Sequence, residues 1–217
     1  MRPGGMRYYP VFLDIAGKPV IVIGGGNIAH QKVVGLLKAS AELTVVSPDL
    51  NQEMASLAAG GRFRHVERDY EPGDLEGYLL AFVATDDRSV NATVAAEGKE
   101  RRVWVNAVDD PPYCDFIMPG IAQQGNLIVA VSTSGTSPAM ARKMREEIET
   151  FLTEDYALML ELAAEVRAEL REKGMLVDSE VWNKALDNDL RRLLAEGKRA
   201  EAKERLLRSL SEPVSAT

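Results

Sequence analysis

Three aspartates stand close together in the segment VNAVDDPPYCDFIMPG, residues 105–120, between two apolar runs. A carboxylate is an effective general base when it is held against a reacting group. Asp109 directly follows a run typical of a buried strand, and parallel sheets bind their ligands at the carboxyl ends of the strands. We therefore predict that Asp109 takes up a proton in catalysis. The alternative is a plain turn, because aspartates followed by two prolines favour turns by themselves.

A second motif predicts a cofactor. VIVIGGGNIAHQK has the spacing Gly24-x-Gly26-x-x-Ala29 directly between a strand-like and a helix-like segment. In this context the glycines allow a tight turn and a close approach of the backbone to a pyrophosphate, which the helix N-terminus also attracts. The alternative is a tight turn without a ligand. The motif favours nucleotide binding, and the expected contacts are Gly24, Gly25, Gly26, Asn27 and Ile28.

Two further segments complete the predicted cofactor site. The second strand ends at Ser47-Pro48, where a ribose-binding acid is usual; here a hydroxyl stands instead, and the nearest arginine is Arg62. Without an arginine for a 2′-phosphate, NAD is favoured over NADP. Thr85 and Asp86 end another apolar strand at the same edge of the expected sheet. Asp86 and Asp87 are equally suited to cap the helix that follows.

The loop STSGTSP, residues 132–138, offers hydroxyls and a glycine at the start of a helix, which is a second potential anion site. Its alternative interpretation is an ordinary helix start with Ser137 as N-cap and Pro138 at the first helical position. The residues expected to hold the anion are Ser132, Thr133, Ser134, Gly135, Thr136 and Ser137.

We expect no metal site, since two histidines and one cysteine are too few, and Cys114 is expected to be a small packed residue.

The elements that must position these residues alternate in type along the first half of the chain. The sequence predicts strands at 18–24, 42–47, 62–68, 78–87 and 102–109, and helices at 28–39, at 49–59 and after Ser89 as a cap. This order predicts an α/β fold with a parallel sheet covered by helices on both faces. A hairpin with its turn at Gln124-Gly125 follows, and then helices at 138–152, 155–173, 179–195 and 198–210.

Composition excludes several classes of function. The 217 residues carry a net charge of −7 without a basic stripe, so we expect no nucleic-acid partner. No apolar run is long enough to cross a bilayer, so we expect no membrane partner. The first ten residues, MRPGGMRYYP, lack the apolar core of a signal peptide. A single cysteine suits a reducing compartment, and we expect a cytoplasmic protein.

Four segments together resemble one known family. PVFLDIAGKPVIVIGGGNIAHQK, VATDD, VNAVDDPPYCDFIMPG and VAVSTSGTSPAMAR occur in the order found in the precorrin-2 dehydrogenase family of sirohaem biosynthesis, some of whose members are also sirohydrochlorin ferrochelatases. The resemblance runs from about Tyr9 to Leu152. It implies a Rossmann-type NAD-binding domain over 1–112, a small α+β dimerisation region over 113–152 and an all-helical domain over 153–217. It also implies a homodimer.

The resemblance implies NAD-dependent oxidation of precorrin-2 to sirohydrochlorin, and the family's essential aspartate matches Asp109. Asp110 is then part of the turn, and Asp115 is expected to begin the first strand of the dimerisation region as a local cap. Because the substrate bears many carboxylates, we expect it to meet the 132–138 loop and a basic residue of the next helix, of which Arg142 is the choice. Some family members carry a fused methyltransferase domain, and some of these have a serine that can be phosphorylated at the position of Thr133.

Two other functions remain open at this point. The first is a bifunctional enzyme that also inserts ferrous iron into sirohydrochlorin, for which Asp109 could remove pyrrole protons. The second is a module that senses NAD without chemistry. The glycine loop fits such a sensor, but a sensor gives no reason for the Asp109 segment and the 132–138 loop to match an enzyme family.

Overall fold

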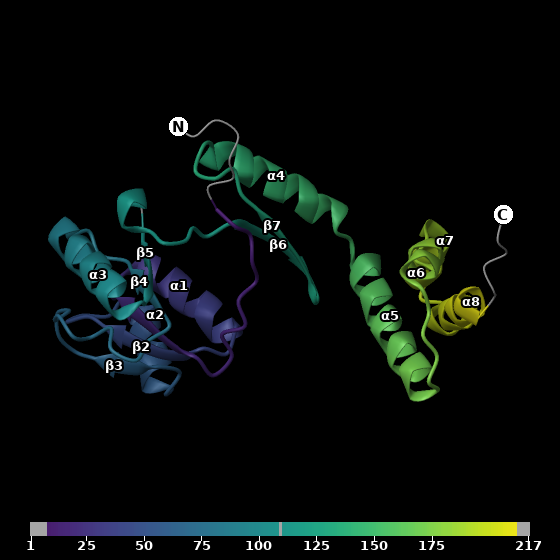
Figure 1. Cartoon of the computed structure of the whole chain (residues 1–217), viewed down its shortest axis with the longest axis horizontal. Coiled ribbons are helices and arrows are strands. Elements are labelled where there is room, and N and C mark those ends of the chain that lie inside the picture. Colours follow the sequence, from purple (N-terminus) through teal and green to yellow (C-terminus); the bar gives the residue numbers. More distant parts are fainter. Residues whose placement is uncertain (1–7, 109, 212–217) are drawn as a thin grey trace. The chain divides into compact units, whose positions relative to one another are not determined.

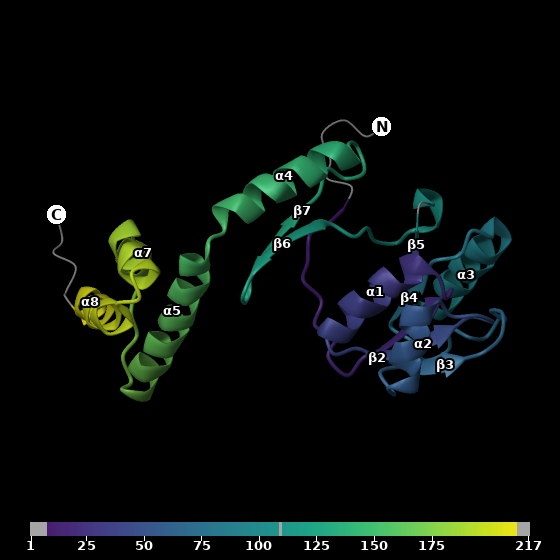
Figure 2. The ribbon, with the colours of Figure 1, turned by 180° about the vertical axis from the view of Figure 1, so that it is seen from behind.

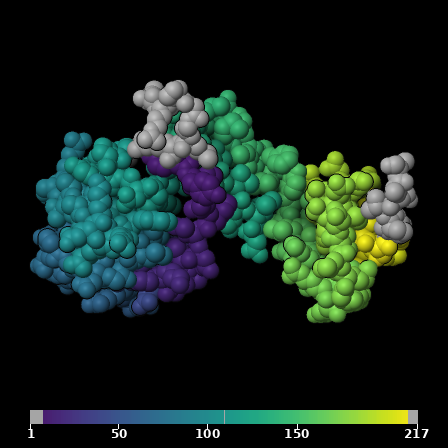
Figure 3. Space-filling view, in the orientation of Figure 1, coloured from purple at the N-terminus to yellow at the C-terminus, as the bar shows by residue number. Residues whose placement is uncertain are grey.

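The computed structural model describes residues 8–108 and 110–211. The chain divides into two compact units, Met1–Met118 and Pro119–Thr217. Among residues 8–18, which precede the first strand and are purple in Figure 3, Tyr9 and Phe12 are exposed and Ile15 is buried. Among the described residues, none of the helices combines the length and the apolar character that crossing a membrane requires. The predicted borders at 112/113 and 152/153 stay predictions.

The first unit is built on a five-stranded sheet in the order β3-β2-β1-β4-β5, with every neighbouring pair parallel (Figure 1). This confirms the predicted α/β fold. Chain order reverses between β1 and β4, and ligands of such sheets bind at this switch point. The strands are β1 Pro19–Ile23, β2 Glu42–Val46, β3 Arg64–Val66, β4 Leu80–Val83 and β5 Trp104–Ala107.

Helices cover both faces of this sheet because its central strands are apolar on both sides. Val20 and Val22 of β1 belong to a core with residues of α1 and α2, whereas Ile21 and Ile23 belong to a second core with Val94 of α3. Figures 1 and 2 show the two sides of this arrangement. The helical segments are α1 Asn27–Lys38, α2 Gln52–Ala59, α3 Arg88–Arg101 and the short 3-10 helix Pro111–Tyr113.

Two details of the first unit correct the sequence-based expectations. Ser89 does not cap α3. Asp87, one of the two aspartates considered as an alternative cap, does so: its carboxylate accepts a hydrogen bond of 2.8 Å from the Ser89 backbone N–H. Asp115 begins no strand. Its N–H donates to the Val105 carbonyl at 2.8 Å, and its Oδ2 accepts from the Val105 N–H at 2.9 Å. Asp115 therefore ties the loop after β5 to the edge of the sheet.

The second unit starts with the predicted antiparallel hairpin, although its strands are shorter than the apolar runs. Ser137 caps the next helix by accepting a hydrogen bond of 3.2 Å from the Met140 N–H, as expected. The predicted single helix over 179–195 is wrong: Asp187 accepts from the Leu190 N–H and starts a new helix there. The elements are β6 Gly120–Gln124, β7 Leu127–Val131, α4 Pro138–Phe151, α5 Glu154–Glu172, α6 Ser179–Ala185, α7 Asn188–Ala195 and α8 Arg199–Ser211.

Candidate functional site

The glycine loop between β1 and α1 allows a side chain at neither of its first two positions. A Cβ atom on Gly24, whose φ is 119°, would lie 2.4 Å from the Ala84 carbonyl oxygen. A Cβ atom on Gly25 would lie 1.9 Å from the Asp49 carbonyl oxygen. Gly26 differs, because no atom lies within 4 Å of the position of its Cβ. The first two glycines are thus required by the fold, and the third faces open space.

That open space lies at the N-terminus of α1. Gly26 is the N-cap residue and gives the helix no side-chain hydrogen bond, whereas Asn51 and Asp87 cap α2 and α3. The Asn27 side-chain oxygen accepts a hydrogen bond of 2.8 Å from the Asn51 amide, which holds the loop against α2. The amide groups and the positive end of the dipole at an uncapped helix start attract an anion such as a pyrophosphate.

A cleft of about 520 Å³ opens beside this loop at the carboxyl edge of the sheet. It brings together seven of the predicted cofactor-binding residues: Gly24, Gly25, Gly26, Ser47, Pro48, Thr85 and Asp86. Its lining also includes residues that were not predicted from the sequence as cofactor contacts, among them Asp49, Asn51, Asp69, Tyr70 and Val90. Ser47 is buried, and its hydroxyl donates to the Asp49 carbonyl at 2.7 Å. Because the hydroxyl oxygen can still accept a hydrogen bond, the expected contact of Ser47 with the ribose stays a prediction.

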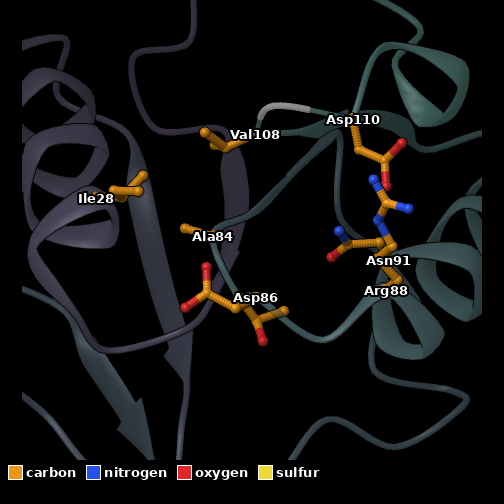
Figure 4. A pocket seen from close by; sticks show the side chains of 8 residues that line it. Ile28, Ala84, Asp86, Arg88, Asn91, Val108 and Asp110 are labelled. Carbon is orange, nitrogen blue, oxygen red and sulfur yellow. The ribbon is translucent and has the colours of Figure 1, made fainter.

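A smaller cavity of about 180 Å³ adjoins the cleft and shares Ala84, Thr85 and Asp86 with it. Figure 4 shows the side chains that line it. Ile28, predicted as a cofactor contact, lies here and not in the larger cleft. Val108 and Asp110 also line this cavity. Asp109 lies between them in the sequence but outside the described residues, so its role stays a prediction.

Tyr70 is held in the wall of the cleft by a buried carboxylate of α3. Its hydroxyl donates to Glu97, which also accepts from the N–H groups of Gly73 at 2.9 Å and Leu75 at 3.2 Å. Arg101 pairs with Glu97 at 2.8 Å. Burial raises the pKa of Glu97, but these hydrogen bonds and the Arg101 charge together bring it below the usual value. Burial and Glu97 both raise the pKa of Tyr70, which stays a neutral hydrogen-bond donor.

This network predicts a pH-dependent contribution to stability. Because the pKa of Glu97 is lowered on folding, its stabilisation is complete above the unfolded value of about 4.3 and is lost as the pH falls through the folded value. We expect Glu97→Gln to lower the free energy of unfolding by about 1–3 kcal/mol at pH 7. The difference from the wild type should shrink below about pH 4.3. Urea denaturation at pH 7 and below about pH 4.3 measures the free energies of unfolding, with the exposed Glu100→Gln as control. A difference between variant and wild type that is the same at both pH values would refute the prediction.

Comparison with known proteins connects this cleft to a family. A family model described as putative NAD(P)-binding matches residues 11–120, just over half of the chain. A model of the central region of sirohaem biosynthesis proteins matches residues 124–150. The chain belongs to this NAD(P)-binding family, and the second match is to the central region of sirohaem biosynthesis proteins. The resemblance seen in the four sequence segments is thereby confirmed.

Relatives within the family agree with this assignment. The siroheme synthase of Methylobacillus flagellatus is 42% identical over 168 residues, 77% of this chain and 36% of that protein. The siroheme synthase of Photobacterium profundum is 37% identical over 204 residues, 93% of this chain and 44% of that protein. The chain thus spans less than half the length of these curated relatives. A solved structure, SirC, a precorrin-2 dehydrogenase, is 27% identical with a TM-score of 0.76, covering 93% of this chain and 100% of that one.

The predicted substrate loop lies in the family's central region, within the second unit. Thr133 holds the loop closed: its hydroxyl donates to the Ser137 carbonyl at 3.0 Å and accepts from the Ser137 N–H at 3.1 Å. Lys143 and Arg145 of α4 pair with glutamates of the same helix. Arg142 is exposed and has no acidic partner within 4 Å among the described residues. Of the three basic residues, Arg142 is therefore the one available for a carboxylate ligand.

Proposed function

We propose that this chain oxidises precorrin-2 to sirohydrochlorin with NAD as the hydride acceptor. The proposal is supported above all by the cleft. It contains the glycine loop at the uncapped start of α1, and it adjoins the small cavity lined by Val108 and Asp110, which flank Asp109 in the sequence. The likeness to SirC, a precorrin-2 dehydrogenase, over the full length of that chain adds weight.

In this proposal the glycine loop and the first amides of α1 bind the pyrophosphate of NAD. The segment Ser47–Asn51 faces the adenosine half, and Thr85 and Asp86 lie on the way to the nicotinamide half. NAD, when bound, accepts a hydride. Oxidation of one substrate molecule removes this hydride together with one proton, and Asp109 takes up the proton. The cleft holds the nicotinamide ring and the flat tetrapyrrole against each other, and such positioning contributes much of a rate enhancement.

The charges of the cleft favour NAD over NADP. Asp49, Asp69 and Asp86 line it, and among the described residues its lining contains neither arginine nor lysine. A 2′-phosphate would bring additional negative charge toward these carboxylates without a basic group to pair with. We therefore expect the protein to bind NAD more tightly than NADP.

We also propose that the protein acts as a homodimer and that the substrate meets the 132–137 loop and Arg142. Ile121, Ile128 and Met140 are exposed on β6, β7 and α4, and exposed apolar residues on strands suit a partner surface.

The cytoplasmic location stays a prediction from the single cysteine. Iron insertion is the second candidate activity, which the siroheme synthase relatives favour.

One assay tests the proposed function. Purified protein is mixed with enzymatically made precorrin-2 and with NAD or NADP, and the absorbance of the reduced cofactor and of sirohydrochlorin is followed. We expect the two products to form in equal amounts and faster with NAD. Ferrous iron is then added to detect conversion of sirohydrochlorin to sirohaem. The proposal fails if reduced cofactor forms no faster than without protein.

A further inference from the structure

The small cavity beside the cleft contains a buried polar group that the proposed function leaves unexplained. Asn91 lies in the first turn of α3 and is 3% exposed. Its Oδ1 is fully buried and has no hydrogen-bond partner among the described residues. Buried side-chain oxygens of folded proteins nearly always have a partner, and the exceptions are frequently explained by a ligand or by function.

The helix itself does not need this side chain. Asp87 already caps α3, and the Asn91 N–H donates to the Asp87 carbonyl at 3.1 Å as part of the helix. The core beneath α3 uses its apolar Val94, and Val90 packs against that core. Figure 4 shows the Asn91 carboxamide among the side chains that line the cavity. Asn91 is therefore a polar group on a ligand-sized surface and is not part of a structural network.

Size and position restrict what the cavity can bind. Its volume of about 180 Å³ is below the roughly 300–1,000 Å³ of ordinary small-molecule sites, so it fits a single ring and no tetrapyrrole. It lies where β4 and β5 end, whereas the larger cleft extends to the end of β2. A dinucleotide that crosses the switch point places its adenosine half toward β2 and its nicotinamide half on the other side.

We propose that Asn91 binds the carboxamide of the nicotinamide ring. A half-turn of the Asn91 carboxamide about χ2 brings its Oδ1 to the ligand, where it accepts a hydrogen bond from the amide N–H₂, since a carboxamide can both donate and accept. Ile28, Ala84 and Val108 offer the ring apolar side chains, and Thr85, Asp86, Arg88 and Asp110 complete the lining of the cavity. Asn91 thereby decides which face of the nicotinamide is turned toward the substrate. This inference deepens the proposed function, because it depends on NAD being the cofactor.

The test compares three ligands by isothermal titration calorimetry in the full chain. NAD carries the carboxamide, deamido-NAD carries a carboxylate that cannot donate, and ADP-ribose lacks the ring. We expect the wild type to bind NAD about tenfold more tightly than deamido-NAD. In Asn91→Leu this preference should disappear, and the affinity for ADP-ribose should stay within about twofold of the wild type. Thr93→Leu, on the exposed face of α3, is the matched control.

The outcomes separate a binding role from a structural one. Because leucine replaces an unpartnered buried amide with an apolar group of similar size, the melting temperature should not fall. An unchanged preference for NAD, or an equal loss of affinity for all three ligands, overturns the inference. Loss of the preference in a protein that does not oxidise precorrin-2 would support the inference and refute the proposed activity.

Discussion

Replacing Asp109 by asparagine is expected to slow precorrin-2 oxidation by about 10²–10⁴-fold, the usual contribution of a general base. Asparagine has nearly the same size and shape as aspartate but cannot take up a proton at pH 7. Binding of NAD should be unchanged, because the cleft residues that meet the pyrophosphate and the adenosine half come from other strands. Initial rates at saturating substrate and calorimetric binding of NAD measure the two effects.

Asp115→Asn is the matched control for this variant. Asp115 belongs to the same acidic segment, but its carboxylate accepts a hydrogen bond from the Val105 N–H, and an asparagine oxygen can still do so. We expect it to keep most of the activity. If Asp109→Asn retains more than about a tenth of the wild-type rate, Asp109 is not the base.

The second large effect is expected at Gly26. Its Cβ position is open and its φ of −85° suits any residue, so Gly26→Val should fold. A side chain there would occupy the space in which the pyrophosphate approaches the backbone. We expect a loss of NAD affinity of about 100-fold, equivalent to about 2.7 kcal/mol. Calorimetry measures the affinity, and circular dichroism checks the fold.

Two other glycines separate ligand binding from folding. Gly25→Ala should lower both NAD affinity and stability, because its Cβ would lie 1.9 Å from the Asp49 carbonyl oxygen. Gly35→Ala, at an exposed position inside α1 with nothing within 4 Å, should leave affinity unchanged and stabilise the protein by up to about 1 kcal/mol. Unchanged NAD affinity in Gly26→Val would exclude the glycine loop as the pyrophosphate site.

Local patterns in the sequence were sufficient for most of the fold. Strand and helix periodicity depends on neighbouring residues, so the order of elements, the glycine turn after β1 and the Ser137 cap all followed from the sequence. Ends of elements were less accurate. Asp87 competes with Ser89 for the start of α3, and Asp187 divides a stretch whose helical period continues across it. Such competition between nearby caps is decided by backbone geometry, which residue types alone do not specify.

The sequence by itself determined the family, the parallel sheet and the edge at which ligands bind, because these follow from periodic and closely spaced residues. Only the tertiary structure decided which distant residues share the cleft. Tyr70 lines the cleft and is held there by a hydrogen bond to Glu97, 27 positions later in the chain. The Ser47 hydroxyl donates to the Asp49 carbonyl, a contact that the sequence did not predict. Asn91 looks like any helical asparagine in the sequence. Its importance comes from burial beside a cavity, which depends on contacts between strands that are far apart in the chain.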